Sequence, residues 1–304
     1  MPVFGIVGIG YIAARVGLFS AEATRGLSSF VFNFAIPALL FRTMATTELP
    51  AELEWGYLVA YFGGVYGVWV AGTLASRYLL RRSGAEPVIA GMTAGFSNNV
   101  LLGVPLVLTT FGEAATLPLF LIIACDSWLL LTTATLQAEL AIGERGDPKV
   151  LVRNVTNALA RNPIVMSLLI GIAWNGLGGP LPGVMDSLTE TLGTAALPCA
   201  VFAMGASLAG FRLSGAVADA GLSVVLKLIA HPLLVWLLAT YVFDLKPLWR
   251  DVATVMAALP VGINVYLLAD RYQAGVGSGV TAILVSTALS VASIAVVLTF
   301  LGVR

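Results

Sequence analysis

Long apolar stretches, separated by short polar connections, dominate the chain. Each stretch approaches the ~20 residues that an α-helix needs to cross the hydrocarbon core of a bilayer. The pattern predicts ten membrane-spanning helices, at about residues 3–20, 24–46, 55–80, 87–111, 114–141, 162–178, 184–209, 216–243, 251–271 and 277–302. The connections are short, so we expect no soluble domain.

Two of these helices contain residues that suit a helix interior poorly. The fourth includes residues 95–105, GFSNNVLLGVP, and the ninth includes residues 257–266, AALPVGINVY. Ser and Asn compete for nearby backbone groups, and Gly and Pro destabilise a helix interior, so both helices are predicted to break there. A broken helix is tolerated in a membrane only where its freed backbone faces protein or a water-filled cavity. Interruptions at corresponding places in two halves of a chain indicate a transporter binding site.

The amino-acid composition indicates a membrane protein and argues against a soluble domain and against nucleic-acid binding. Hydrophobic residues make up 59% and charged residues 11%, whereas a soluble domain carries roughly 25% charge. With a mean hydropathy of +0.95, the chain is predicted to be an integral membrane protein. The formal net charge is zero, and basic residues cluster only at Arg77, Arg81 and Arg82, so nucleic acid is not an expected partner.

The cysteines and the first apolar run need no special chemistry. Cys125 and Cys199 lie inside apolar runs and are interpreted as packing residues, and no cofactor or metal is expected. The first apolar run lacks a preceding basic region, so it reads as a retained span rather than a cleaved signal peptide.

The distribution of Lys and Arg predicts the orientation in a cell (inner, or plasma) membrane. With the N-terminus outside, eleven basic residues fall at inner ends of spans and four at outer ends, and Lys227 lies within a span. This excess predicts that both termini lie outside. The inner residues are Arg15, Arg25, Arg77, Arg81, Arg82, Arg145, Lys149, Arg153, Arg161, Arg212 and Arg271, and the outer ones are Arg42, Lys246, Arg250 and Arg304.

A cytoplasmic connector, residues 143–161, divides the chain into repeats at 1–142 and 162–304 with five predicted spans each. An odd number of spans per half forces opposite orientations, so the halves would be inverted repeats. Residues 36–41, IPALLF, resemble residues 197–202, LPCAVF. A shift of 163 positions aligns Ser97 with Pro260, Gly112 with Gly275 and Ser127 with Ser290.

Four sequence strings resemble the auxin efflux carrier family, the bacterial relatives of the plant PIN carriers. They are SNN with LGVP at 97–105, RNP at 161–163, LPC with MGASL at 197–208, and LPVGINVYLLA at 259–269. The resemblance covers essentially the whole chain, and the last two strings are its most specific part. The chain departs from the family at Ser97, where plant carriers usually have proline.

The resemblance implies an all-α polytopic fold of ten helices in two inverted five-helix repeats, with broken helices four and nine crossing at the centre. It further implies that helices one, two, six and seven form a supporting panel, that helices three to five and eight to ten form a mobile bundle, and that the protein is a homodimer. Plant members of the family export an aryl-acetate hormone, and some bacterial members are regarded as malonate or malate permeases.

The predicted substrate site lies at the two breaks. An asparagine amide at a break can donate to a substrate carboxylate, assisted by the positive end of the following half-helix. This assigns substrate binding to Asn98, Asn99, Pro260, Gly262, Asn264 and Tyr266. The alternative is that the amides only cap backbone groups that the breaks set free.

Three ionisable residues are candidates for ion or proton coupling. Asp126 is the only acid deep in an apolar run, and burying a carboxylate in a bilayer costs at least ~2.5 kcal/mol. It either faces a cavity and functions there or is a neutralised structural acid. Lys227 and His231 lie four residues apart on one predicted helix face. Lys227 could pair with Asp126 or extend to the interface, and His231 could simply donate to a carbonyl freed by Pro232.

Together these features predict secondary transport of a small organic anion by elevator-type alternating access, with the substrate at the helix four and nine crossover. The alternative is a sodium-coupled organic-anion symporter of the bile-acid type, which would share this architecture. An intramembrane enzyme would need paired acids or a nucleophile motif within the spans, and neither is found. A passive channel would need a ring of like charge or a pore motif.

Overall fold

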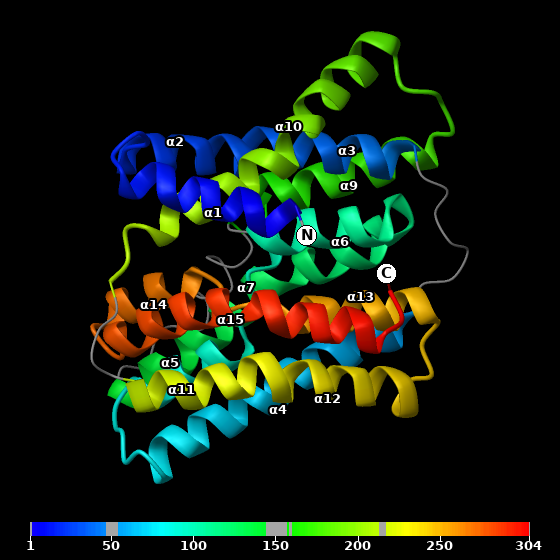
Figure 1. Ribbon diagram of the computed structural model, residues 1–304. Helices are drawn as coiled ribbons and strands as arrows, with labels where there is room; N and C mark the ends of the chain where they lie inside the picture. The colour runs from blue at the N-terminus through cyan, green and yellow to red at the C-terminus, as the bar shows by residue number, and fades with distance from the viewer. Residues whose placement is uncertain (1, 47–53, 144–156, 158–159, 213–216, 304) are drawn as a thin grey trace. The chain divides into compact units, whose positions relative to one another are not determined.

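The computed structural model describes the chain except residues 1, 47–53, 144–156, 158–159, 213–216 and 304 (Figure 1). Most of the predicted connector and the side chain of Ser127 therefore lie outside the described residues, as do Arg145, Lys149, Arg153 and Arg304 of the basic-residue comparison. The described part is helical, without a β-sheet; its one isolated β-bridge joins Ser97 and Val261.

Helices occur in all ten predicted segments of the described chain. The α-helices are α1 (Pro2–Arg15), α2 (Ala21–Phe30), α3 (Ile36–Thr46), α4 (Trp55–Tyr78), α5 (Glu86–Gly95), α6 (Val104–Phe111), α7 (Thr116–Ile142), α9 (Pro163–Gly176), α10 (Gly183–Leu208), α11 (Val217–Val225), α12 (His231–Leu237), α13 (Pro247–Ala258), α14 (Asn264–Tyr272) and α15 (Val276–Phe300). Short π-helical or 3-10 segments are η1 (Val31–Ala35), η2 (Asn99–Gly103), η3 (Glu113–Ala115), η4 (Leu226–Ala230) and η5 (Leu238–Val242).

Six helical segments of the described chain are long and apolar enough to cross a membrane: Ala21–Thr46, Trp55–Tyr78, Glu113–Ile142, Gly183–Leu208, Ala218–Val242 and Val276–Phe300. Three shorter apolar helices, Val3–Arg15, Asn99–Phe111 and Pro163–Gly176, accompany them. Only helices with internally bonded backbone or closed barrels can span lipid, and these segments are helices. The protein is an all-helical, multi-span membrane protein.

The helices group into two compact units. Unit 1 comprises Met1–Leu53, Val100–Ala124 and Val152–Gly210, and unit 2 comprises Glu54–Asn99, Cys125–Leu151 and Phe211–Arg304. The chain changes unit within η2 and within α7.

In unit 1, α1 packs along α10, and α3 packs against both α9 and α10 (Figure 1). The approach of α1 and α10 depends on Gly205, because a Cβ there would collide with the carbonyl oxygen of Val7. Small residues permit such close backbone packing between membrane helices. The start of α9 follows from its sequence, since the Asn162 side chain accepts from the Ile164 amide at 3.0 Å and Pro163 occupies the first turn.

In unit 2, α4 packs against α5 and α12, and α13 packs against α12, α15 and α4 (Figure 1). Hydrogen bonds between polar side chains join α4 to α7: the Trp69 indole donates to Gln137 at 2.9 Å, and the Tyr66 hydroxyl pairs with Thr133 at 2.8 Å. Such bonds satisfy polar groups that would otherwise be costly to bury. This unit contains residues 95–99 of the first string that was predicted to break and the whole of the second, residues 257–266.

Candidate substrate-binding site

Both interruptions lie in the predicted stretches, and they pair with each other. α5 ends at Gly95, and the chain is extended at Phe96 (φ −81°, ψ 115°). α13 ends at Ala258, and the chain is extended at Leu259 (φ −61°, ψ 152°). The extended segments run antiparallel. The backbone amide of Asn98 donates to the Pro260 carbonyl at 2.9 Å, and the backbone amide of Gly262 donates to the Phe96 carbonyl at 3.0 Å. Each break thus satisfies backbone groups of the other.

Two further features support this pairing. The Val261 amide donates to the Ser286 hydroxyl of α15 at 3.0 Å, so another freed backbone group has a partner. Gly262 lies so near the first break that a Cβ would come within 2.6 Å of the Phe96 ring and 2.8 Å of the Ser97 carbonyl oxygen. A residue with a side chain would therefore force the segments apart, and glycine is required by the close approach.

Asn98 and Asn264 keep their side-chain amides available at the paired breaks. Both residues are half-buried, and neither side chain hydrogen-bonds another described residue. Asn264 is the first residue of α14, whose N-terminus lacks a side-chain cap. A helix N-terminus carries a partial positive charge of roughly half a unit. Free amides beside such an end could hold a carboxylate.

Asn99 has a different environment from Asn98. It is buried, its Nδ2 donates to the Tyr61 hydroxyl at 3.2 Å, and its Oδ1 has no partner among the described residues. The amide also interacts with the carboxylate of buried Asp126 in α7. The structure therefore assigns the two neighbouring asparagines to separate groups, Asn98 to the breaks and Asn99 to a buried polar cluster.

The remaining members of this cluster are Lys227 and His231, both fully buried. Lys227 Nζ donates to the Ala257 carbonyl at 2.6 Å, lies 3.0 Å from His231 Nδ1 and interacts electrostatically with Asp126. The Lys227 side chain is thus enclosed among residues of unit 2. The His231 side chain contacts Lys227 instead of a carbonyl freed by Pro232. We call Asn99, Tyr61, Asp126, Lys227 and His231 the charged cluster.

Lys227 joins the charged cluster to the second break. Ala257 lies in the last turn of α13, where carbonyls lose their intrahelical donors because the helix ends at Ala258. A cation bonded there both satisfies a carbonyl and complements the negative end of the helix.

The other predicted residues are placed as follows. Pro260 and Gly262 are buried within the second break, where they form backbone bonds. Tyr266 is half-buried on α14, and its ring packs edge-on against Phe211 at 5.2 Å between centroids. Sequence reasoning missed Tyr61 and Ser286. Tyr61 follows Tyr57 by four residues, so a buried polar stripe on α4 was the available signal; nothing in the sequence indicated the role of Ser286.

The fold and the paired breaks are those of a membrane transporter, and comparison with known proteins agrees. The chain matches the family profile described as membrane transport protein over residues 1–298. It belongs to this family, the auxin efflux carriers, and so to a family of transporters rather than enzymes.

Relatives occur in bacteria and plants. The chain is 30% identical to a provisionally named malonate transporter of Rhizobium meliloti (strain 1021), over 97% of this chain and 92% of that protein. It is 25% identical to auxin efflux carrier component 8 of Arabidopsis thaliana, over 90% of this chain and 88% of that protein. It is 24% identical to the uncharacterized transporter YfdV of Escherichia coli (strain K12), over 94% of this chain and 91% of that protein.

Proposed function

We propose that the protein transports a small organic anion, such as a dicarboxylate or an aryl carboxylate, by elevator-type alternating access. The observation that carries this proposal is the pairing of the two helix breaks, which leaves the amides of Asn98 and Asn264 free beside the N-terminus of α14. A carboxylate held there would accept hydrogen bonds from neutral donors, with the helix end supplying partial positive charge. Malonate in the name of the Rhizobium relative and auxin in that of the Arabidopsis relative are consistent with carboxylate substrates.

We further propose that ten helices cross the membrane as two inverted repeats, with both termini outside, and that the protein is a homodimer. The division into units supports different roles for different helices. Unit 1 includes α1, α2, α3, α9 and α10, the helices expected to form the static panel, and unit 2 includes α4, α5 and α11 to α15, most of those expected to move. The exceptions are α6 and the first part of α7, which were expected to move but lie in unit 1. In this proposal the paired breaks carry the substrate as part of the moving unit.

Solid-supported-membrane electrophysiology on proteoliposomes tests the proposal. Malonate, malate, aryl acetates and bile acids are applied in sodium-free and in sodium-containing buffer. We expect at least one carboxylate to evoke a current without sodium, and we expect Asn98→Ala and Asn264→Ala to raise the concentration for half-maximal current. About tenfold per variant corresponds to the loss of one hydrogen bond to a charged group, at the low end of its ~1.5–3 kcal/mol.

The matched control is Asn33→Ala. Asn33 belongs to unit 1, is exposed, and its amide donates only to Ser29. If Asn98→Ala and Asn264→Ala transport like Asn33→Ala, with all three folded and inserted, the substrate does not bind at the breaks.

A sodium-coupled symporter is the second candidate, favoured by one observation. Two buried acceptor oxygens of the charged cluster, Asn99 Oδ1 and Asp126 Oδ1, have no hydrogen-bond donor among the described residues. Acceptors without donors suit a cation or a proton, although Lys227 already supplies one positive charge nearby. A current that required sodium and was lost in Asp126→Asn would establish this candidate; a sodium-independent current would leave proton coupling through Asp126, Lys227 and His231 as the remaining question.

A further inference from the structure

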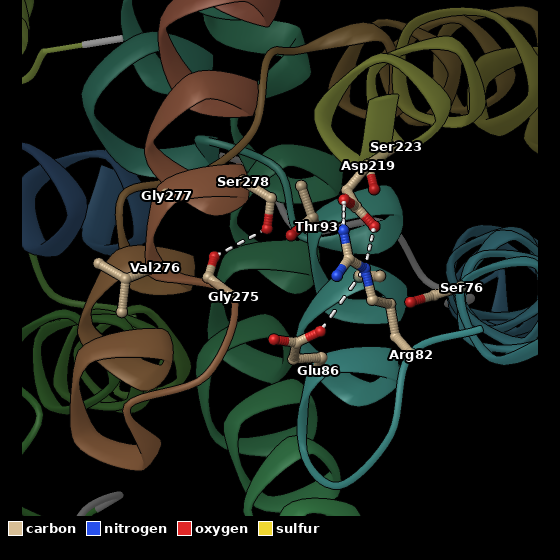
Figure 2. Close-up of a pocket in the computed structure, with 11 residues that line it drawn as sticks. Ser76, Arg82, Glu86, Thr93, Asp219, Ser223, Gly275, Val276, Gly277 and Ser278 are labelled. Atoms are coloured by element: carbon tan, nitrogen blue, oxygen red, sulfur yellow. Dashed lines mark hydrogen bonds and ion pairs between the residues drawn. The ribbon is translucent and has the colours of Figure 1, made fainter. Parts of the chain in front are cut away.

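Unit 2 contains a polar cavity, of about 220 Å³, that shares no residue with the paired breaks. Its walls come from the end of α4, the loop that follows it, and the starts of α5, α11 and α15 (Figure 2). Three helix N-termini therefore meet at one cavity. Glu86 occupies the first turn of α5, and Asp219 occupies that of α11, so two of the three ends are matched by a carboxylate.

Arg82 lines the cavity, and Asp219 and Glu86 hold its guanidinium from two sides (Figure 2). Nε and Nη2 donate to the two oxygens of Asp219 at 3.2 and 2.8 Å, and Nε lies 3.7 Å from Glu86 Oε2. The Asp219 hydrogen bonds raise the pKa of Arg82 above its usual value, so the group is always charged. Nη1 forms no bond with a described residue. The carboxylates thus fix the orientation of the guanidinium and leave one edge free.

The third N-terminus, that of α15, has no such match. Its first turn contains no acidic residue, and its N-cap is Gly275, whose φ of +62° is a left-handed conformation and which offers no side-chain acceptor. The amides of the first three residues, Val276 to Ser278, have no acceptor within the helix, and these three residues line the cavity. Counting about half a charge for each N-terminus, Arg82 and the three helix ends slightly outweigh the two carboxylates.

An independent feature indicates that the cavity has an occupant. Ser76, in the last turns of α4, is 1% exposed and lines the cavity, and its hydroxyl has no partner among the described residues. Figure 2 shows this hydroxyl directed inward, toward the side chain of Arg82. Buried hydroxyls nearly always have a hydrogen-bond partner, so one left free inside a polar cavity points to a bound group.

We propose that this cavity binds a compact oxyanion, a carboxylate or a phosphate group, between Arg82 Nη1 and the first amides of α15, with the Ser76 hydroxyl completing the donors. The site is separate from the substrate site at the breaks and does not depend on it. The same chemistry fits a soluble anion or the phosphate of an anionic lipid headgroup, and the experiment below distinguishes these sources.

Thermal unfolding of the full-length protein with added inorganic phosphate tests this proposal. Sodium chloride of equal ionic strength serves as the reference, because general screening also changes with salt. We expect the unfolding temperature of the wild type to rise with the logarithm of the anion concentration above the dissociation constant. Ser76→Ala should weaken binding of the anion about tenfold, the loss of one hydrogen bond to a charged group.

Ser278→Asp is the decisive variant. It places a carboxylate in the first turn of α15, where it complements the helix end and occupies the position of the anion. We expect this variant to be at least as stable as the wild type without anion and to lose the anion-dependent rise. Ser278→Asn, of similar size but uncharged, should keep the rise. Because no transport is measured, the result does not depend on the function proposed above.

Two results would overturn the proposal: no rise in the wild type beyond that in chloride, or an equal rise in Ser278→Asp. Repeating the phosphate titration in bilayers shows whether the bound oxyanion is a soluble anion or a lipid headgroup. If soluble phosphate stabilises the protein in phosphatidylcholine but not in phosphatidylglycerol, the lipid headgroup fills the site; if it does so in both, the ligand is a soluble anion.

Discussion

Lys227→Met removes a fully buried ammonium group and keeps a side chain of similar length. The ammonium donates to the Ala257 carbonyl at 2.6 Å, lies 3.0 Å from His231 Nδ1 and interacts electrostatically with Asp126 without forming an ion pair with it. A hydrogen bond from a charged group contributes about 1.5–3 kcal/mol. We therefore expect Lys227→Met to lose about 1.5–3 kcal/mol in the free energy of unfolding.

The assay is denaturant unfolding of the detergent-solubilised protein, followed by tryptophan fluorescence, for Lys227→Met, Asp126→Asn and the double variant. We expect the double variant to lose about 0.5–3 kcal/mol less than the sum of the single losses, since neither charge is then left alone. Lys246→Met is the matched control. Lys246 pairs with Glu54 at 3.3 Å, but its side chain is 73% exposed, so its loss should stay within about 1 kcal/mol.

The reasoning is refuted if Lys227→Met costs no more than Lys246→Met. It is refuted in part if the single losses add in the double variant, because Lys227 and Asp126 would then not interact.

Three further variants test the paired breaks by the same unfolding measurement. Gly262→Ala should cost about 1–3 kcal/mol, because its Cβ would overlap the neighbouring segment, whereas Gly221→Ala, which meets nothing within 4 Å, should be neutral or slightly stabilising; equal effects would contradict the close approach. Ser286→Ala should cost about 1–3 kcal/mol by leaving the buried Val261 amide without an acceptor, and a loss no larger than that of Gly221→Ala would mean that another group takes its place. Tyr61→Phe should cost about 0.5–1.5 kcal/mol, the value of its hydrogen bond from Asn99; an unchanged midpoint would show that this bond contributes nothing.

The helix positions and the breaks could be read from the sequence because their causes are local. Residues 95–105 and 257–266 combine Gly, Pro and Asn within an apolar run, and each of these residues disfavours a continuous helix by itself. The lengths of the apolar runs similarly fix where helices lie. No knowledge of distant residues is needed for either inference.

The partners of the site residues depend on contacts between distant parts of the chain, and these have no local signature. Asn98 and Asn99 are identical in type and adjacent, yet one faces the paired breaks and the other bonds Tyr61, 38 positions away. Likewise, the sequence showed that Lys227 and His231 share a helix face but not that Lys227 reaches the carbonyl of Ala257, 30 positions away. Only tertiary packing decides such contacts.

The bond between Lys227 and Ala257 gives the charged cluster a direct effect on the proposed substrate site. Ala257 belongs to the last turn of α13, and the second break begins directly after that helix ends at Ala258. A proton, cation or variant that changes the attraction between Lys227 and Asp126 therefore also changes how firmly that turn is capped. Because the second break hydrogen-bonds to the first, the change would reach both breaks.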